Sequence, residues 1–159
     1  MAFLPGNRFM QAFYRYQRWR WFVPAALWYA FWKRFWGVVG GVDIPLCTKV
    51  GPGLWLPHPN GVVVHEDSVI GNDCILRQQV TLGIGGSIPG APILEDRVIV
   101  GAGAKVIGGV RIGEGAEIGA NAVVLRDVPP GGIAVGVPAR IVRVKSPAES
   151  RIESTLTAP

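Results

Sequence analysis

The 159-residue chain has few of the residues that mark particular protein classes. It contains only two cysteines, Cys47 and Cys74, which cannot form the disulfide framework of a small secreted domain. We therefore expect a protein of a reducing compartment, the cytoplasm. Charged residues make up only 17% of the chain, but 49% is hydrophobic, which is too apolar for a disordered chain. The length suits one domain.

Acidic residues are absent from residues 1–42, whereas six basic residues give this segment a charge of +6. The same stretch holds fourteen of the fifteen aromatic residues, and eighteen of the twenty-two glycines follow it. Two segments of different composition therefore meet near Gly40-Gly41. We predict an aromatic and basic helical segment over residues 1–42, a catalytic domain over 43–145 and a flexible tail over 146–159.

No hydrophobic run in the N-terminal segment is long enough to cross a bilayer. Its longest charge-free run is residues 21–32, which Pro24 interrupts, and no signal-peptide cleavage site follows it. Two interpretations remain open. The segment packs on the glycine-rich part or on another subunit, or residues 1–36 make a peripheral contact with the inner face of the membrane through aromatic and basic side chains. The segment is too apolar for nucleic acid.

A six-residue repeat runs through the glycine-rich part. Aliphatic residues recur every sixth position, with one two-residue shift after Leu56 and one gap after Leu82. The thirteen positions are Ile44, Val50, Leu56, Val64, Ile70, Leu76, Leu82, Leu94, Val100, Val106, Ile112, Ile118 and Val124. A period of six fits neither an α-helix nor a hairpin, and is typical of a parallel β-helix with three faces per coil. We expect roughly four coils, with glycine and asparagine at the corners.

The repeat breaks at residues 60–63 and at residues 83–92, GIGGSIPGAP, which carry no charge. Because function in solenoids usually lies where insertions leave the repeat, we expect both breaks to form walls of a site.

The stretches VDIPLCTKVGPGLWLPHPNGVVVHEDSVIGNDCILRQQVTLG and VIVGAGAKVIGGVRIGEGAEIGANAVVLRDVPPGGIAVGVPARIV resemble the hexapeptide-repeat acyltransferases, in particular the serine acetyltransferase-like branch. The resemblance covers residues 42–145 and includes the repeat, the loop position and the closing PARIV segment together. It implies a left-handed parallel β-helix, a homotrimer and acetyl-coenzyme A sites between neighbouring subunits.

Transfer of an acetyl group from a thioester to a hydroxyl needs a base, an oxyanion donor and a groove for coenzyme A. His58 lies beside the first break and can act near neutral pH. The resemblance implies that His58 is the general base, paired with Asp43, fifteen residues earlier, which would fix the tautomer of its ring. The alternative for Asp43 is a turn cap after Gly40-Gly41.

The resemblance also suggests residues for the two substrates. Pantetheine amides would pair with backbone groups at Gly83, Ala102 and Ala120, although repeat spacing alone also explains the two alanines. Arg140 and Arg143, with Lys145 as a weaker addition, would meet the phosphates. Gln79 is a candidate for the acceptor side. His65 is a second candidate there, but a surface corner position also explains it.

The acceptor is predicted from departures from the serine-specific pattern. That branch has an aspartate before the histidine and an Arg-His pair in the loop, whereas here Pro57 and Gly90-Ala91 stand at these positions. The carboxylate of an amino-acid acceptor is normally bound by a basic side chain through charge-assisted hydrogen bonds. We therefore expect the acceptor to be a sugar hydroxyl of exopolysaccharide, capsule or lipopolysaccharide synthesis, with serine O-acetylation as the alternative.

The alternative to an enzyme is a non-catalytic β-helical scaffold. A γ-type carbonic anhydrase, which shares this helix, is not expected, because its zinc needs three histidine ligands and His58 and His65 alone do not supply a family-like set.

Overall fold

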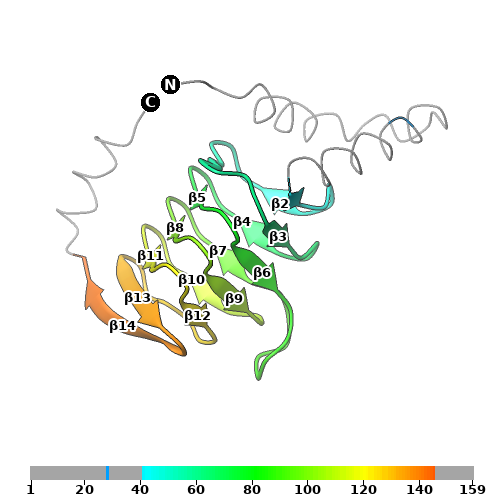
Figure 1. Cartoon of the computed structure of the whole chain (residues 1–159). Coiled ribbons are helices and arrows are strands. Elements are labelled where there is room, and N and C mark those ends of the chain that lie inside the picture. The colour runs from blue at the N-terminus through cyan, green and yellow to red at the C-terminus, as the bar shows by residue number, and fades with distance from the viewer. Residues whose placement is uncertain (1–27, 29–40, 146–159) are drawn as a thin grey trace.

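The computed structural model describes Trp28 and residues 41–145, and it confirms an all-β solenoid, a left-handed parallel β-helix (Figure 1). The helices expected over residues 1–42 and the flexible tail over 146–159 lie outside the described residues, except for Trp28, which is helical and 64% exposed. No helix in the described residues is long and hydrophobic enough to cross a membrane.

Three sheets form the faces of the solenoid, and parallel pairing joins successive coils within each sheet. The first sheet contains β1 (Val42–Asp43), β3 (Val62–Val64), β6 (Thr81–Gly83), β9 (Lys105–Ile107) and β12 (Val123–Val124). The second sheet contains β2 (Lys49–Val50), β4 (Val69–Ile70), β7 (Ile93–Leu94) and β10 (Arg111–Ile112). The third sheet contains β5 (Ile75–Leu76), β8 (Ile99–Val100), β11 (Glu117–Ile118), β13 (Gly132–Gly136) and β14 (Ala139–Val144).

Five layers are present instead of the expected four. A bridge from Trp55 to Ile75 adds a first layer to the third sheet, and a bridge from Ile112 to Val128 adds a last layer to the second. The six-residue repeat did not predict the final layer, because β13 no longer follows the six-residue spacing. Strand β14 then turns back antiparallel to β13 and ends the described fold.

The aliphatic positions of the repeat form the core. With the exception of the partly buried Val50, all thirteen are at most 9% exposed. Small residues fill the column beside them, for example Ala104, Ala116 and Ala122, all fully buried. Stacking these side chains from coil to coil therefore removes one continuous apolar column from water.

Two hydroxyl groups interrupt this column near the N-terminal end. Ser68 Oγ and Thr48 Oγ1 are buried and have no hydrogen-bond partner among the described residues. Because an unpaired buried hydroxyl costs about 1–3 kcal/mol, we expect Ser68→Ala to raise the free energy of unfolding by about 1 kcal/mol. Denaturant titration measures the change. Ser87→Ala, on the exposed loop, is the control and should change nothing; a destabilised Ser68→Ala protein would contradict the prediction.

The two thiols differ in environment. Cys47 is exposed, whereas Cys74 is buried and donates to Glu95 O at 3.1 Å. Burial raises the pKa of Cys74 from 9.0 to about 11, so the thiol stays neutral at pH 8. We expect a disulfide dye to react quickly with one thiol in the native protein and with two after unfolding.

The same pKa predicts how stability depends on pH. Since the folded pKa of Cys74 lies above the unfolded one, the stabilisation is complete below pH 9 and is lost as the pH rises towards 11, by about 2–3 kcal/mol.

For the dye experiment, the Cys47→Ser variant should lose the fast reaction of the native protein. Two thiols that react quickly in the native protein would disprove the assignment of Cys74 as buried.

Candidate active site

Predicted site residues meet along the corner where each coil passes from the third sheet to the first. This corner, the His58 edge, comprises residues 57–61, 78–79, 102–103 and 120–121. Hydrogen bonds stack its turns: Gln79 N donates to Asn60 O at 2.7 Å, and Asn121 N donates to Ala102 O at 2.8 Å. The structure therefore brings His58, Gln79, Ala102 and Ala120 to one edge, with the His58, Gln79 and Ala120 positions exposed.

Left-handed backbone conformations build this edge. Gly61 and Gly103 have φ of 68° and 73°, and Gln79 and Asn121 adopt 59° and 56°. Side chains rarely accept such angles, so glycine and asparagine are favoured, and Gln79 is an exception. The Gly61 position also faces Gln79 closely, because a Cβ there would lie 3.1 Å from Gln79 Cγ. The turn that carries His58 is thus packed directly on Gln79.

Asp43 and His58 approach the first sheet from different coils. Asp43 ends β1 and pairs with Val63 of β3, the strand that begins four residues after His58. Both side chains belong to exposed residues, and among the described residues no hydrogen bond joins them. The pairing of Asp43 with His58 therefore stays a prediction.

Gly83 and His65 lie at the opposite side of the first sheet, in the loop edge, which comprises His65, residues 83–92 and Gly108-Gly109. His65 follows β3, and its N–H donates to Leu82 O at 2.8 Å. Its ring Nδ1 accepts from Asp67 N at 3.2 Å, as expected of a corner residue. The structure thus separates Gly83 from Ala102 and Ala120 within one chain, and the two histidines stand at opposite ends of β3.

The loop of residues 84–92 projects from the solenoid between β6 and β7 (Figure 1). It is anchored at its base, where Gly108 N donates to Gly83 O at 2.9 Å and Gly109 N donates to Ile88 O at 3.1 Å. A Cβ on Gly109 would lie 2.3 Å from Pro89 O, so only glycine allows this approach. The sequence interpretation found the loop but missed Gly108-Gly109 as its anchor, although two adjacent glycines outside the corner pattern were the available signal.

The hairpin of β13 and β14 continues the His58 edge at its C-terminal end. Gly119 N donates to Ala134 O at 2.8 Å, so the middle of β13 lies beside Gly119, the residue before Ala120. In β14, Ile141 pairs with Ala134 and Arg143 with Ile133, which makes Val142 the extra residue of a bulge. Because the bulge shifts the alternation by one, Arg140 and Arg143 lie on the same face of the hairpin.

Lys145 has a different environment from the two arginines. Its side chain is only 8% exposed, and its Nζ pairs with Glu117 Oε1 of β11. This ion pair ties the end of the hairpin to the preceding coil. Contact between Lys145 and a phosphate would require the pair to open, and it remains a prediction.

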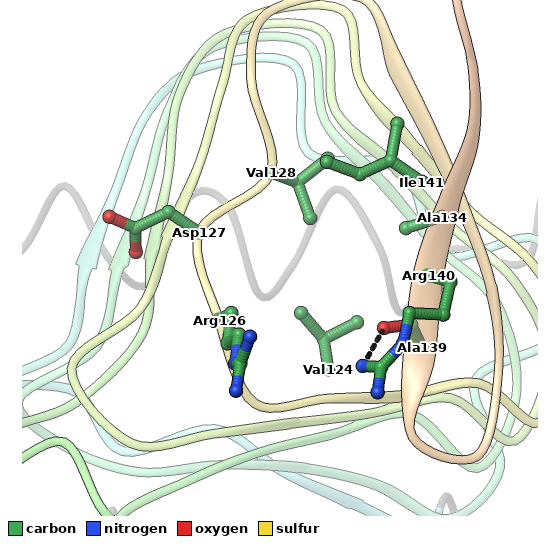
Figure 2. Close-up of a pocket in the computed structure, with 8 residues that line it drawn as sticks. All are labelled: Val124, Arg126, Asp127, Val128, Ala134, Ala139, Arg140 and Ile141. Atoms are coloured by element: carbon green, nitrogen blue, oxygen red, sulfur yellow. Dashed lines mark hydrogen bonds between the residues drawn. The ribbon is translucent and has the colours of Figure 1, made fainter.

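A cavity of about 300 Å³ opens at the C-terminal end of the solenoid (Figure 2). Its floor consists of the core residues Val124, Val128 and Ala134, which come from the last layer of the three sheets. Arg126 and Arg140 stand at its rim. Of the described residues predicted for the site, only Arg140 lines it, so this cavity is the open end of the core.

Within residues 41–145, no three histidine, cysteine, aspartate or glutamate side chains gather as metal ligands would.

The three-sided coil, the projecting loop and the closing hairpin define a hexapeptide-repeat protein. A family model, bacterial transferase hexapeptide (six repeats), matches residues 91–126. The chain belongs to the hexapeptide-repeat acyltransferase superfamily.

Known relatives and solved structures support this assignment. Serine acetyltransferase of Escherichia coli K12 is 42% identical over 144 residues, which cover 89% of this chain and 52% of the relative. A soybean serine acetyltransferase complexed with serine is 47% identical, with a TM-score of 0.63, and covers 67% of this chain and 44% of that one. A Brucella abortus serine acetyltransferase in complex with coenzyme A is 35% identical, with a TM-score of 0.67 and coverages of 72% and 46%. The chain spans about half the length of these relatives.

Proposed function

We propose that the protein is an acetyl-coenzyme A-dependent O-acetyltransferase with His58 as general base. The observation that carries the proposal is the single edge on which His58, Gln79, Ala102, Ala120 and the arginine hairpin follow one another. Successive coils are about 4.8 Å apart, so His58 and the hairpin lie about 15–20 Å from each other along the edge. This length suits an extended pantetheine arm with its thioester near His58 and its phosphates near Arg140 and Arg143.

In this mechanism His58 takes the proton from the acceptor hydroxyl as the oxygen attacks the thioester carbonyl. A tetrahedral intermediate forms, and a backbone N–H at Gly83 or Ile84 on the loop edge of a neighbouring subunit would stabilise its oxyanion. Collapse of the intermediate breaks the carbon–sulfur bond, and the imidazolium of His58 returns the proton to the sulfur of coenzyme A. Asp43 would orient the ring of His58 and stabilise its charged form.

A homotrimer accounts for the separation of the two edges. Within one chain, the His58 edge and the loop edge lie on opposite sides of the first sheet. Three-fold packing would bring the His58 edge of one subunit against the loop edge, with Gly83 and His65, of its neighbour. The basic, aromatic residues 1–36 would then be presented together, and a peripheral membrane contact remains our proposal for them.

L-Serine is the acceptor that the relatives favour, because those named above are serine acetyltransferases. The sugar hydroxyl expected from the sequence finds no support among them. Nevertheless, the departures at Pro57 and Gly90-Ala91 leave the loop without a basic partner for an amino-acid carboxylate. Trp55, half exposed three residues before His58, also offers an apolar surface to a sugar ring. These two observations keep a neutral acceptor as the second candidate.

One experiment separates the candidates. Purified protein is mixed with acetyl-coenzyme A and either L-serine or a panel of neutral sugars, and release of the free thiol is followed with a disulfide dye. Fast release with L-serine supports the first acceptor and eliminates the sugar. Release with sugars alone supports the second. Coenzyme A binding is measured by calorimetry alongside, because a non-catalytic scaffold should show no binding.

A further inference from the structure

We infer that Lys105 is a positioning residue for coenzyme A, because its ammonium group fixes the middle of the His58 edge. Lys105 begins β9 of the first sheet, and its neighbours Ala104 and Val106 are fully buried. Side chains alternate along a strand, so Lys105 stands on the outer face of the sheet. The inference rests on the proposed function, since it takes this edge as the coenzyme groove.

The ammonium group of Lys105 joins two coils at the corner. Its Nζ donates to Gln79 O at 2.9 Å in one coil and to Gly103 O at 3.0 Å in the next. Both acceptor residues have left-handed backbone, with φ of 59° and 73°. Hydrogen bonds from a charged donor are roughly twice as strong as neutral ones. Lys105 therefore stabilises a backbone shape that glutamine does not favour by itself.

Hydrogen bonds connect this corner with the turn of His58. Gln79 N donates to Asn60 O at 2.7 Å, and Asn60 N donates to His58 O at 2.8 Å. On the other side, Gly103 directly follows Ala102, the predicted pantetheine contact. Loss of the ammonium group would thus loosen the groove on both sides of Gln79.

A lysine ammonium group has three donors, and two are used by contacts with the described residues. We expect the third to donate to an amide carbonyl of pantetheine bound in the groove. Lys105 would then support the coenzyme both through the corner and directly.

The test compares Lys105→Met with a matched control, Lys49→Met. Lys49 is also a strand lysine on the outer face, but it is exposed and its side chain makes no hydrogen bond or ion pair with other described residues. For Lys105→Met we expect the KM for acetyl-coenzyme A and the Kd for coenzyme A to rise about tenfold, while kcat and the acceptor KM change by less than about twofold. Lys49→Met should match the wild type in all four quantities.

Lys105→Gln keeps the test decisive if the methionine variant does not fold, and its Kd should also exceed that of the wild type. Wild-type coenzyme affinity in the folded variants, or a loss in kcat alone, would overturn the inference. If the wild type binds coenzyme A but transfers acetyl to no acceptor, the proposed function fails. In that case a weaker Kd in Lys105→Met still supports the positioning role, because calorimetry needs no turnover.

Discussion

Replacing His58 with alanine is expected to lower kcat for acetyl transfer by about a thousandfold, because no other imidazole lies on the His58 edge to accept the hydroxyl proton. The side chain is exposed, so its loss should leave the fold intact. Dye-coupled thiol release measures kcat, and calorimetry should find the Kd for coenzyme A within about twofold of the wild type.

His65→Ala is the informative comparison, because it removes the second histidine from the other end of β3. If His65 contacts the acceptor, its loss raises the acceptor KM and leaves kcat within about tenfold of the wild type. A larger loss of kcat in His65→Ala than in His58→Ala would transfer the base to the loop edge. Near-normal turnover in His58→Ala would refute the assignment of His58.

Gly109→Ala is expected to have the second largest effect, through the loop. The added Cβ would lie 2.3 Å from Pro89 O, an impossible contact between two backbone positions. Either the loop of residues 84–92 leaves the solenoid or the corner deforms, and such overpacking typically costs about 1–3 kcal/mol. We expect kcat/KM for the acceptor to fall at least about tenfold, equivalent to about 1.4 kcal/mol. Protease cleavage within the loop should accelerate.

Gly115→Ala is the matched control for this variant. Gly115 has a φ of +66°, whereas Gly109 does not adopt a left-handed backbone. A Cβ on Gly115 would meet no atom within 4 Å, so Gly115→Ala introduces backbone strain without a clash, and Gly109→Ala introduces the clash without that strain. Its cost should be about 1 kcal/mol with unchanged kcat/KM. Equal loop cleavage in both variants would contradict the anchoring role of Gly109.

The fold could be predicted from sequence because the same requirement recurs in every coil. Leu94, Val100 and Val106 each bury an aliphatic side chain at a fixed position, so one error in register would expose the whole column. The final layer did not repeat the pattern. Ala134 fills its core position after a pair of prolines, and only the three-dimensional pairing with Ile118 reveals it.

The site was less predictable, because its contacts depend on side chains that the repeat does not constrain. The six-residue spacing placed His58 beside a break in the repeat. The separation of fifteen residues between Asp43 and His58 does not by itself determine whether their side chains form a hydrogen bond. Lys145 looked like the two arginines in sequence, yet Glu117, 28 residues away, pairs with it. The role of Lys105 was invisible because its two partners belong to adjacent turns of the corner.

The reversal of the chain into β14 also affects how molecules meet end to end. A stack of parallel strands exposes free backbone donors and acceptors at its last layer, and a second solenoid could continue the same ladder into a fibre. Over the third face, an incoming parallel coil would meet a strand that runs the opposite way, with Arg140 and Arg143 on one side of it. We therefore expect the hairpin that we propose for phosphate recognition also to disfavour end-to-end stacking on that face, and we expect neutralising both arginines to reduce solubility as well as coenzyme binding.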